Sequence, residues 1–143
     1  MLTANDQILA RTITEKSAEF RALLDRLEQR DGIPRTTAAA LGDAAEGTLA
    51  VLFTDEPHRC PEAWDAAVIF PELLRATARA PRAAVLPPDE SRTAARQFGV
   101  RKYPSILVLR DGASLGVLEG LRDWASFPSE LAGLLAGPAG GAA

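Results

Sequence analysis

The chain is poor in the residues that most often carry chemistry. Its 143 residues include one cysteine, Cys60, and one histidine, His58. A single cysteine excludes an internal disulfide, a CxxC redox pair and a cysteine-rich zinc cage. Disulfide exchange by a dithiol mechanism is also excluded, because a lone thiol can form a mixed disulfide but has no second thiol to resolve it.

Long apolar runs and a surplus of positive charge are missing as well. No run approaches the roughly 20 apolar residues that a membrane-spanning helix requires, and the N-terminal stretch MLTANDQILARTITEK has no apolar signal-peptide core. The net charge of −3 gives no electrostatic reason for binding nucleic acid or anionic lipid. We therefore expect a cytoplasmic protein that neither inserts into a membrane nor binds nucleic acid.

The composition is that of an ordinary globular domain, with 47% hydrophobic and 24% charged residues. A chain of this length can bury a hydrophobic core as one domain. We expect a single domain over residues 1–136. The last residues, 137–143 (GPAGGAA), are expected to form a disordered tail.

The first half of the chain predicts a helix, a strand and a second helix. Residues 17–30 form a helical pattern whose apolar face comprises Phe20, Leu23, Leu24 and Leu27. Residues 35–47 are weakly patterned and fit a loop or a short helix. The apolar run 49–53 (LAVLF) predicts a strand covered on both faces.

A long helix is expected next, from about Glu62 to Ala80, with Pro61 at its first position. Pro71 lies inside this pattern and is expected to kink the helix. Its predicted apolar stripe comprises Trp64, Ala67, Val68, Pro71 and Leu74.

Two further strands and two helices are expected in the second half. Residues 82–86 (RAAVL) predict a buried strand, and residues 89–98 a short helix capped by Asp89 and closed by Gly99. Two apolar runs that flank Asp111-Gly112 predict a β-hairpin.

A last helix is expected over residues 127–135, and Trp124 before it is expected in the core or a smaller apolar cluster. The element order predicts an α/β fold with a mixed central sheet and helices on both faces.

This element order resembles thioredoxin. The likeness covers about residues 10–136, and segment 98–120 (FGVRKYPSILVLRDGASLGVLEG) carries it most clearly. The resemblance implies a thioredoxin-like three-layer fold and a cis peptide bond before Pro104. In thioredoxins the kink proline follows the second redox cysteine by five positions, which places the two redox positions at Ala63 and Ala66. Both sulfurs are absent.

The signatures PEAWDAAVIFPELLR, FGVRKYPSILVLRDG and GVLEGLRDWA, without a CxxC motif, are similar to the hydrogenase accessory family called HyaE or HupG. The resemblance implies a chaperone that engages the precursor of the [NiFe] hydrogenase small subunit, including its twin-arginine export leader. No cofactor and no catalytic residue are expected on this basis. The oligomeric state is left open, with a homodimer among the outcomes.

His58 and Cys60 leave two chemical alternatives to weigh. Cys60 precedes a helix, whose N-terminal dipole lowers a thiol pKa, and His58 could serve as its base. The surrounding carboxylates, from Asp55 to Asp65, disfavour the thiolate. A metal site would need further ligands, because two side chains two positions apart do not complete one.

The remaining candidate is a groove that binds an extended partner segment, as in the thioredoxin fold, beside the cis-proline. The expected lining residues are Asp55, Glu56, Trp64, Asp65, Tyr103 and Pro104. Aromatic side chains suit a binding hot spot, and the carboxylates suit an arginine-bearing leader. Trp64 fits a place in the core equally well.

The sequence therefore favours a binding protein for the hydrogenase small-subunit precursor. Two alternatives remain open at this point: a thiol-dependent enzyme or sensor that uses Cys60, and a thioredoxin-like adaptor for another partner.

Overall fold

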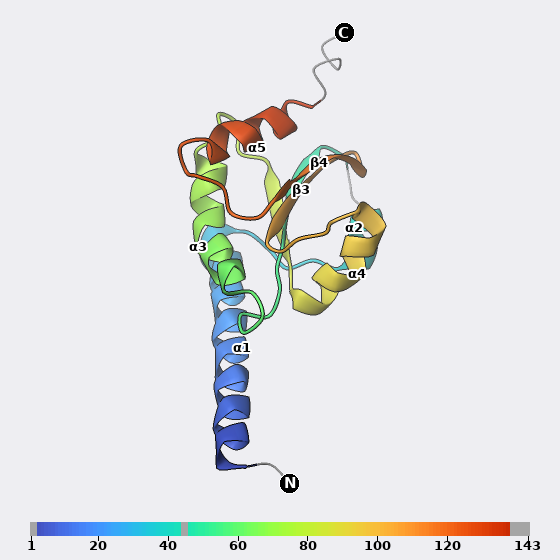
Figure 1. Cartoon of the computed structure of the whole chain (residues 1–143). Helices are drawn as coiled ribbons and strands as arrows, with labels where there is room; N and C mark the ends of the chain where they lie inside the picture. Colours follow the sequence, from blue (N-terminus) through green and yellow to red (C-terminus); the bar gives the residue numbers. More distant parts are fainter. Residues whose placement is uncertain (1–2, 44–45, 138–143) are drawn as a thin grey trace.

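The computed structural model describes residues 3–43 and 46–137, and it contains a four-stranded mixed sheet between two layers of helices (Figure 1). The strand order is β2-β1-β3-β4. Strand β1 (Thr48–Phe53) pairs in parallel with β2 (Arg82–Leu86) and antiparallel with β3 (Ser105–Arg110), which pairs antiparallel with β4 (Ala113–Glu119). The predicted α/β thioredoxin-like fold is confirmed.

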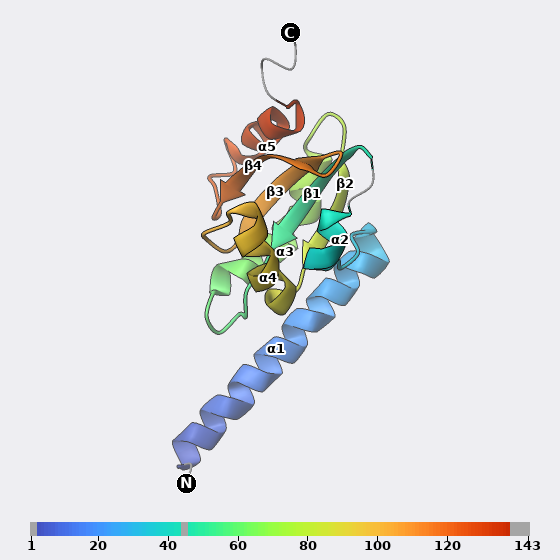
Figure 2. The same cartoon turned by 90° about the vertical axis from the view of Figure 1, so that its right-hand side faces the viewer.

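Helices cover both faces of this sheet (Figures 1 and 2). On one face lie α1 (Ala4–Asp31), α3 (Pro61–Arg75) and α5 (Phe127–Leu135). On the other lie α2 (Ala38–Gly42) and α4 (Pro88–Phe98).

The alternation of side chains along β1 explains why two apolar cores form. Ala50 and Leu52 pack with α1, α3 and α5, whereas Val51 and Phe53 pack with α2 and α4. The apolar run of β1 is thus buried on both sides, as the sequence predicts.

Helix α1 is much longer than predicted, and its first half projects away from the rest of the protein (Figures 1 and 2). It begins with a capping box, in which the Thr3 N–H donates to Asp6 Oδ2 at 3.1 Å and the Asp6 N–H donates to Thr3 Oγ1 at 3.0 Å. These hydrogen bonds lower the pKa of Asp6. The predicted apolar face of residues 17–30 is confirmed, since all four of its members are buried.

Helix α3 ends at Arg75, so the expected end at Ala80 was wrong. Thr77 accounts for the early end, because its backbone N–H and its Oγ1 both donate to the carbonyl of Leu74, at 3.2 and 2.7 Å. Pro71 lies inside the helix, as expected. Val68 does not belong to the buried stripe, since it is 50% exposed.

Two other local expectations were also wrong. Asp89 does not cap α4, because Pro87 holds the N-cap position and Asp89 lies in the first turn, where it pairs with Arg92. Trp124 is 49% exposed and belongs to neither apolar cluster. The segment that carries it, between β4 and α5, has no regular structure over residues 121–123.

The other boundaries agree with the sequence. Gly99 closes α4 with φ +70°, and α5 spans the predicted residues. The hairpin turns at Asp111 and Gly112, whose φ values of 52° and 84° suit a type I′ turn. The short helix α2 falls in the weakly patterned stretch. Of the expected tail, residues 138–143 lie outside the described part of the chain.

Gly116 provides a test of how tightly α5 packs on β4. It has φ +152°, and a Cβ built there would lie 2.7 Å from Leu134 Cδ2. We expect Gly116→Ala to lower the free energy of unfolding by about 1–3 kcal/mol, because an L side chain is strained at φ +152° and the new methyl group also crowds Leu134. Urea unfolding measures the change. Gly133→Ala on α5 is the matched control, since a Cβ there meets nothing within 4 Å; a comparable loss in the control would contradict the explanation.

Candidate partner-binding site

The segment that joins β1 to α3 is anchored by buried hydrogen bonds. Thr54 is fully buried; its N–H donates to Ser91 Oγ at 2.8 Å and its Oγ1 donates to the Leu86 carbonyl at 2.7 Å. Ser91 Oγ donates to the same carbonyl at 2.9 Å. These bonds join the ends of β1 and β2 to α4, so the residues that follow Thr54 start from a fixed position.

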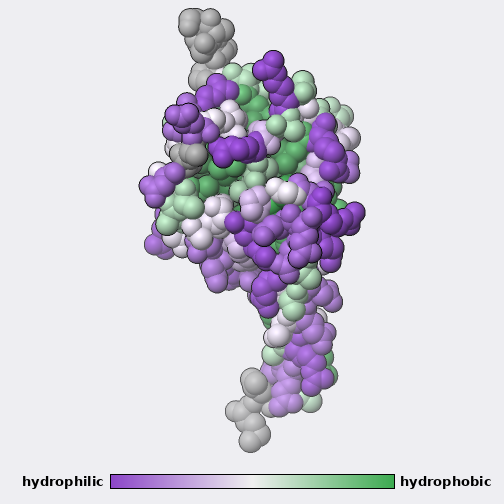
Figure 3. All heavy atoms as spheres, turned by 180° about the vertical axis from the view of Figure 1, so that it is seen from behind, coloured by the Kyte–Doolittle hydropathy of each residue, from purple (hydrophilic) through white to green (hydrophobic). Residues whose placement is uncertain are grey.

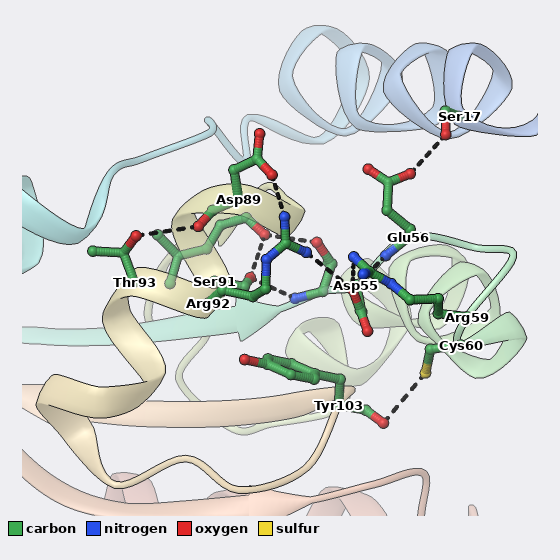
Figure 4. A network of polar contacts seen from close by, with 12 residues as sticks. Ser17, Asp55, Glu56, Arg59, Cys60, Asp89, Ser91, Arg92, Thr93 and Tyr103 are labelled. Carbon is green, nitrogen blue, oxygen red and sulfur yellow. Dashed lines mark hydrogen bonds and ion pairs between the residues drawn. The ribbon is translucent and has the colours of Figure 1, made fainter. Parts of the chain in front are cut away.

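Asp55 lies at the centre of a polar network on this segment (Figure 4). Its Oδ1 accepts from the Glu56 N–H at 2.8 Å, from Arg59 Nη2 at 3.1 Å and from Arg92 Nη1 at 3.4 Å. Arg92 also pairs with Asp89. The Asp55 carboxylate is therefore already matched by two cations of this chain, and an arginine from a partner would have to compete with them.

Glu56 faces in another direction, toward the long helix. Its Oε2 accepts from Ser17 Oγ of α1 at 2.6 Å (Figure 4). Its carbonyl accepts from the N–H groups of Arg59 and Cys60, both at 2.9 Å. Glu56 thus fixes the loop to α1 and shapes the turn that leads into α3.

Cys60 is the N-cap residue of α3 and is half-buried. Its Sγ donates to the carbonyl of Tyr103 at 3.3 Å (Figure 4). Burial raises the pKa of the Cys60 thiol, and the charges of Glu62 and Asp55 raise it further. His58 is exposed, and no hydrogen bond joins it to Cys60 in the described structure. The features that activate a nucleophilic cysteine are therefore not assembled here.

The raised pKa of Cys60 predicts that its thiol reacts slowly with disulfide reagents. A thiol with a raised pKa is less ionised at neutral pH, and the thiolate is the reactive form. We expect Cys60 of the folded protein to react with a disulfide reagent at pH 7 more slowly than the same residue in urea. The rate should still be rising with pH above the ordinary thiol range near 9.0. A rate in the native protein above that in urea would show an activated thiol.

The two positions that the resemblance to thioredoxin assigns to its sulfurs are buried. Ala63 has no exposed surface and Ala66 is 5% exposed. Ala63 donates its N–H to the Cys60 carbonyl at 3.0 Å within the first turn of α3. Both methyl groups belong to the core formed by α1, α3 and α5.

Trp64 is half-buried, so it agrees with both places that the sequence left open for it, the core and the wall of a groove. Its ring packs against Phe20 of α1, with the ring centroids 6.0 Å apart. It also borders a surface groove between α1 and the start of α3. The groove is lined by Lys16, Glu19, Pro57, Pro61, Trp64 and Asp65. We call this the Trp64 groove.

Tyr103 and Pro104 are joined by a cis peptide bond, as the resemblance implies. Pro104 is buried, and its carbonyl accepts from the Gly120 N–H at 2.7 Å. Tyr103 is half-buried; burial raises the pKa of its phenol, and the Asp55 carboxylate adds to the effect. The Tyr103 carbonyl receives the Cys60 thiol, so a partner strand pairing here would share or displace that contact.

The six predicted residues therefore fall into separate groups. Asp55 lies with Arg59 and Arg92, near enough to Tyr103 for all three charges to act on the pKa of its phenol. Trp64 and Asp65 line the Trp64 groove, whereas Glu56 contacts α1.

Sequence reasoning missed four charged residues of this region, which are Lys16, Glu19, Arg59 and Arg92. Apolar spacing that extends upstream of Phe20 could have indicated the first pair. Arg92 is far from Asp55 in the sequence, and no local pattern signals that contact.

Neither a membrane span nor a metal site emerges from the described residues. No helix in residues 3–43 and 46–137 combines the length and the apolar content needed to cross a bilayer. In the same residues, no three side chains among histidine, cysteine, aspartate and glutamate come together to hold a metal ion.

Comparison with known proteins identifies relatives over most of the chain. Residues 23–127 match the family described as hydrogenase-1 expression protein HyaE. The hydrogenase expression/formation protein HupG of Bradyrhizobium diazoefficiens is 34% identical over 117 residues, which cover 78% of this chain and 79% of that protein.

Two proteins named HoxO are similar as well. The hydrogenase expression/formation protein HoxO of Azotobacter vinelandii is 32% identical, over 80% of this chain and 78% of that protein. HoxO of Cupriavidus necator is 35% identical over 66% of this chain and 60% of its own length. The family match and these identities show that the chain belongs to the HyaE family of hydrogenase expression/formation proteins.

Proposed function

We propose that the protein is a non-catalytic, cytoplasmic chaperone in hydrogenase maturation, which binds the precursor of a [NiFe] hydrogenase small subunit together with its twin-arginine leader. Membership of the HyaE family supports a role in hydrogenase maturation, since the relatives are hydrogenase expression/formation proteins. By holding the precursor reversibly, the chaperone delays its export until assembly is complete.

The observation that carries the proposal is the Trp64 groove. It is lined by the half-buried Trp64, by a buried Pro57 and an exposed Pro61, and by the charged side chains of Lys16, Glu19 and Asp65. A partly exposed tryptophan in a groove is a common binding hot spot. Carboxylates around it complement an arginine-bearing segment. We place the extended leader across this groove and past the start of α3, where the Cys60 thiol contacts the Tyr103 carbonyl.

Binding without thiol chemistry agrees with the residues at the helix start. Alanines replace the sulfurs at Ala63 and Ala66, and the remaining thiol of Cys60 is held in its protonated form by burial and neighbouring carboxylates. An insulin-reduction assay tests this part of the proposal. Turnover by the wild-type protein that disappears in Cys60→Ser would contradict it.

Co-purification tests the choice of partner. The full chain is used to capture the small-subunit precursor with its leader and, separately, the same subunit without it. We expect the leader-bearing form to be retained more strongly, because the leader supplies arginines that Glu19 and Asp65 complement, two carboxylates against the single cation Lys16 in the lining of the Trp64 groove. Retention of neither form would show that the assigned partner is wrong.

Charge reversal tests the acidic part of the site. We expect Asp65→Lys to weaken precursor binding more than Asp55→Lys, because Asp65 is exposed and makes no ion pair among the described residues, whereas Asp55 is matched by two arginines. Binding of the precursor by Asp65→Lys should also depend less on salt concentration than binding by the wild-type protein. Asp43→Lys, at the end of α2 on the opposite face, is the matched control. Equal losses from Asp65→Lys and Asp43→Lys would place the contact elsewhere.

A further inference from the structure

The projecting half of α1 carries an apolar stripe that is only partly covered in the described structure, since Leu9 is exposed and Ile13 is half-buried. At 3.6 residues per turn, Leu9 and Ile13 lie within about 20° of Phe20 around the helix axis. They therefore continue, beyond the end of the globular part, the face that Phe20 and Leu24 bury against α3. Leu9 is 59% exposed and Ile13 is half-buried. In Figure 3 this segment shows isolated hydrophobic patches among hydrophilic side chains.

Two charged residues complete the stripe at its ends. Asp6 precedes Leu9 by three positions, and Lys16 follows Ile13 by three. The order along the stripe is thus Asp6, Leu9, Ile13, Lys16, with spacings of three, four and three. These are the spacings of the a and d positions of a coiled coil. The pattern differs from a client groove, because it is a regular seam with opposite charges at its two ends.

This order is complementary to itself when a second copy is turned end to end. In an antiparallel pair centred on residue 11, Leu9 lies opposite Ile13 of the other copy, and Asp6 lies opposite Lys16. A parallel pair would instead oppose Asp6 to Asp6 and Lys16 to Lys16, which like-charge repulsion disfavours. Such an arrangement has the two-fold symmetry of most protein dimers.

We propose that the projecting half of α1 is a self-association surface, on which two copies of the chain form an antiparallel helix pair through Leu9 and Ile13. The family match begins at residue 23, so this segment lies outside it. Each copy contributes only the short stretch from Asp6 to Lys16 to the seam. The surface area buried between the two helices is therefore smaller than the roughly 1,200 Å² that stable interfaces bury. The dimer is therefore weak and depends on concentration.

Sedimentation velocity of the full chain from about 1 µM to about 1 mM measures the association. We expect a reversible monomer–dimer equilibrium whose dissociation constant rises at least about tenfold in Leu9→Gln/Ile13→Gln, because four apolar side chains leave the interface. Both positions are outside the core, so the variant folds. Ile8→Gln is the matched control: Ile8 is 61% exposed but points about 120° away from the stripe, and association should persist.

Cross-linking tests the orientation. In a Cys60→Ser background, Leu9→Cys and Ile13→Cys proteins are mixed and oxidised. The antiparallel pair predicts that the mixed disulfide forms faster than either homodimer, because a disulfide requires Cα atoms within about 7 Å. Faster Leu9→Cys homodimers would establish a parallel pair and overturn the proposal.

Two results of the sedimentation experiment would also overturn it. One is a chain that stays monomeric throughout, and the other is a dimer that Leu9→Gln/Ile13→Gln leaves intact. If the chain is monomeric and this variant loses capture of the small-subunit precursor instead, the stripe binds the client rather than a second copy. That outcome would leave the proposed function standing, so the two proposals fail separately.

Discussion

Phe20→Ala should lower the free energy of unfolding by about 3–5 kcal/mol, the cost of removing a large buried aromatic side chain. Phe20 is 1% exposed and lies in the core that joins α1 and α3 to the sheet. Its ring also supports Trp64, at a centroid distance of 6.0 Å. The substitution leaves a cavity on the inner side of Trp64, so it weakens both the fold and the wall of the Trp64 groove. Urea unfolding followed by circular dichroism measures the loss.

Ile8→Ala provides the control for this prediction. It shortens another apolar side chain of the same helix, but Ile8 is 61% exposed. The expected change is within about 0.5 kcal/mol, as for most surface substitutions. If Phe20→Ala cost no more than Ile8→Ala, the core described between α1 and α3 would not exist in solution.

Trp64→Ala should weaken binding of the small-subunit precursor by about 30-fold or more, which corresponds to the roughly 2 kcal/mol of an interface hot spot. Trp64 supplies the largest side chain of the groove, and only part of its surface packs against Phe20. Surface plasmon resonance or calorimetry with the leader-bearing precursor measures the change. Circular dichroism confirms that the variant remains folded at the temperature of the experiment.

Trp124→Ala is the matched control for Trp64→Ala. Trp124 is the other tryptophan of the chain, is 49% exposed, and lies between β4 and α5 rather than at the groove. We expect it to leave precursor binding unchanged. A loss in Trp124→Ala with none in Trp64→Ala would move the binding site to the segment before α5.

The regular elements with strong periodicity were predictable from the sequence. The apolar run of β1 predicts a buried strand, and Asp111-Gly112 predicts a hairpin turn. Both predictions were confirmed. The alternation of Ala50 and Leu52 with Val51 and Phe53 requires cover on both faces of the sheet, which the helices provide.

The errors have local physical causes. Helical periodicity continues past Arg75, but Thr77 takes the Leu74 carbonyl and ends α3. Asp89 is a residue type that favours helix caps, yet Pro88 starts α4 one position earlier. The length of α1 escaped prediction because Leu9 and Ile13, although spaced as on one helical face, lie beyond the buried core and pack on no other element that the sequence identifies. Its start depends on the Thr3–Asp6 capping box.

The site was only partly predictable for a similar reason. Trp64, Asp65 and Pro61 are close in the sequence, so their common surface could be expected. The arginines that neutralise Asp55 come from the loop and from α4, and only the folded chain brings Arg92 beside it. The sequence therefore indicated that these residues meet at the start of α3, but it could not show which carboxylates are already paired with arginines of this chain.

We propose that the start of α3 and its surroundings hold the small-subunit precursor. Backbone and indole NMR shifts of the ¹⁵N-labelled full chain, titrated with leader-bearing precursor, test it most directly. We expect changes concentrated at the Trp64 indole, at Asp65 and at Tyr103, with little change along α2 and the Asp111-Gly112 turn. No change at these residues at saturation, or changes confined to α2 and the hairpin, would contradict it.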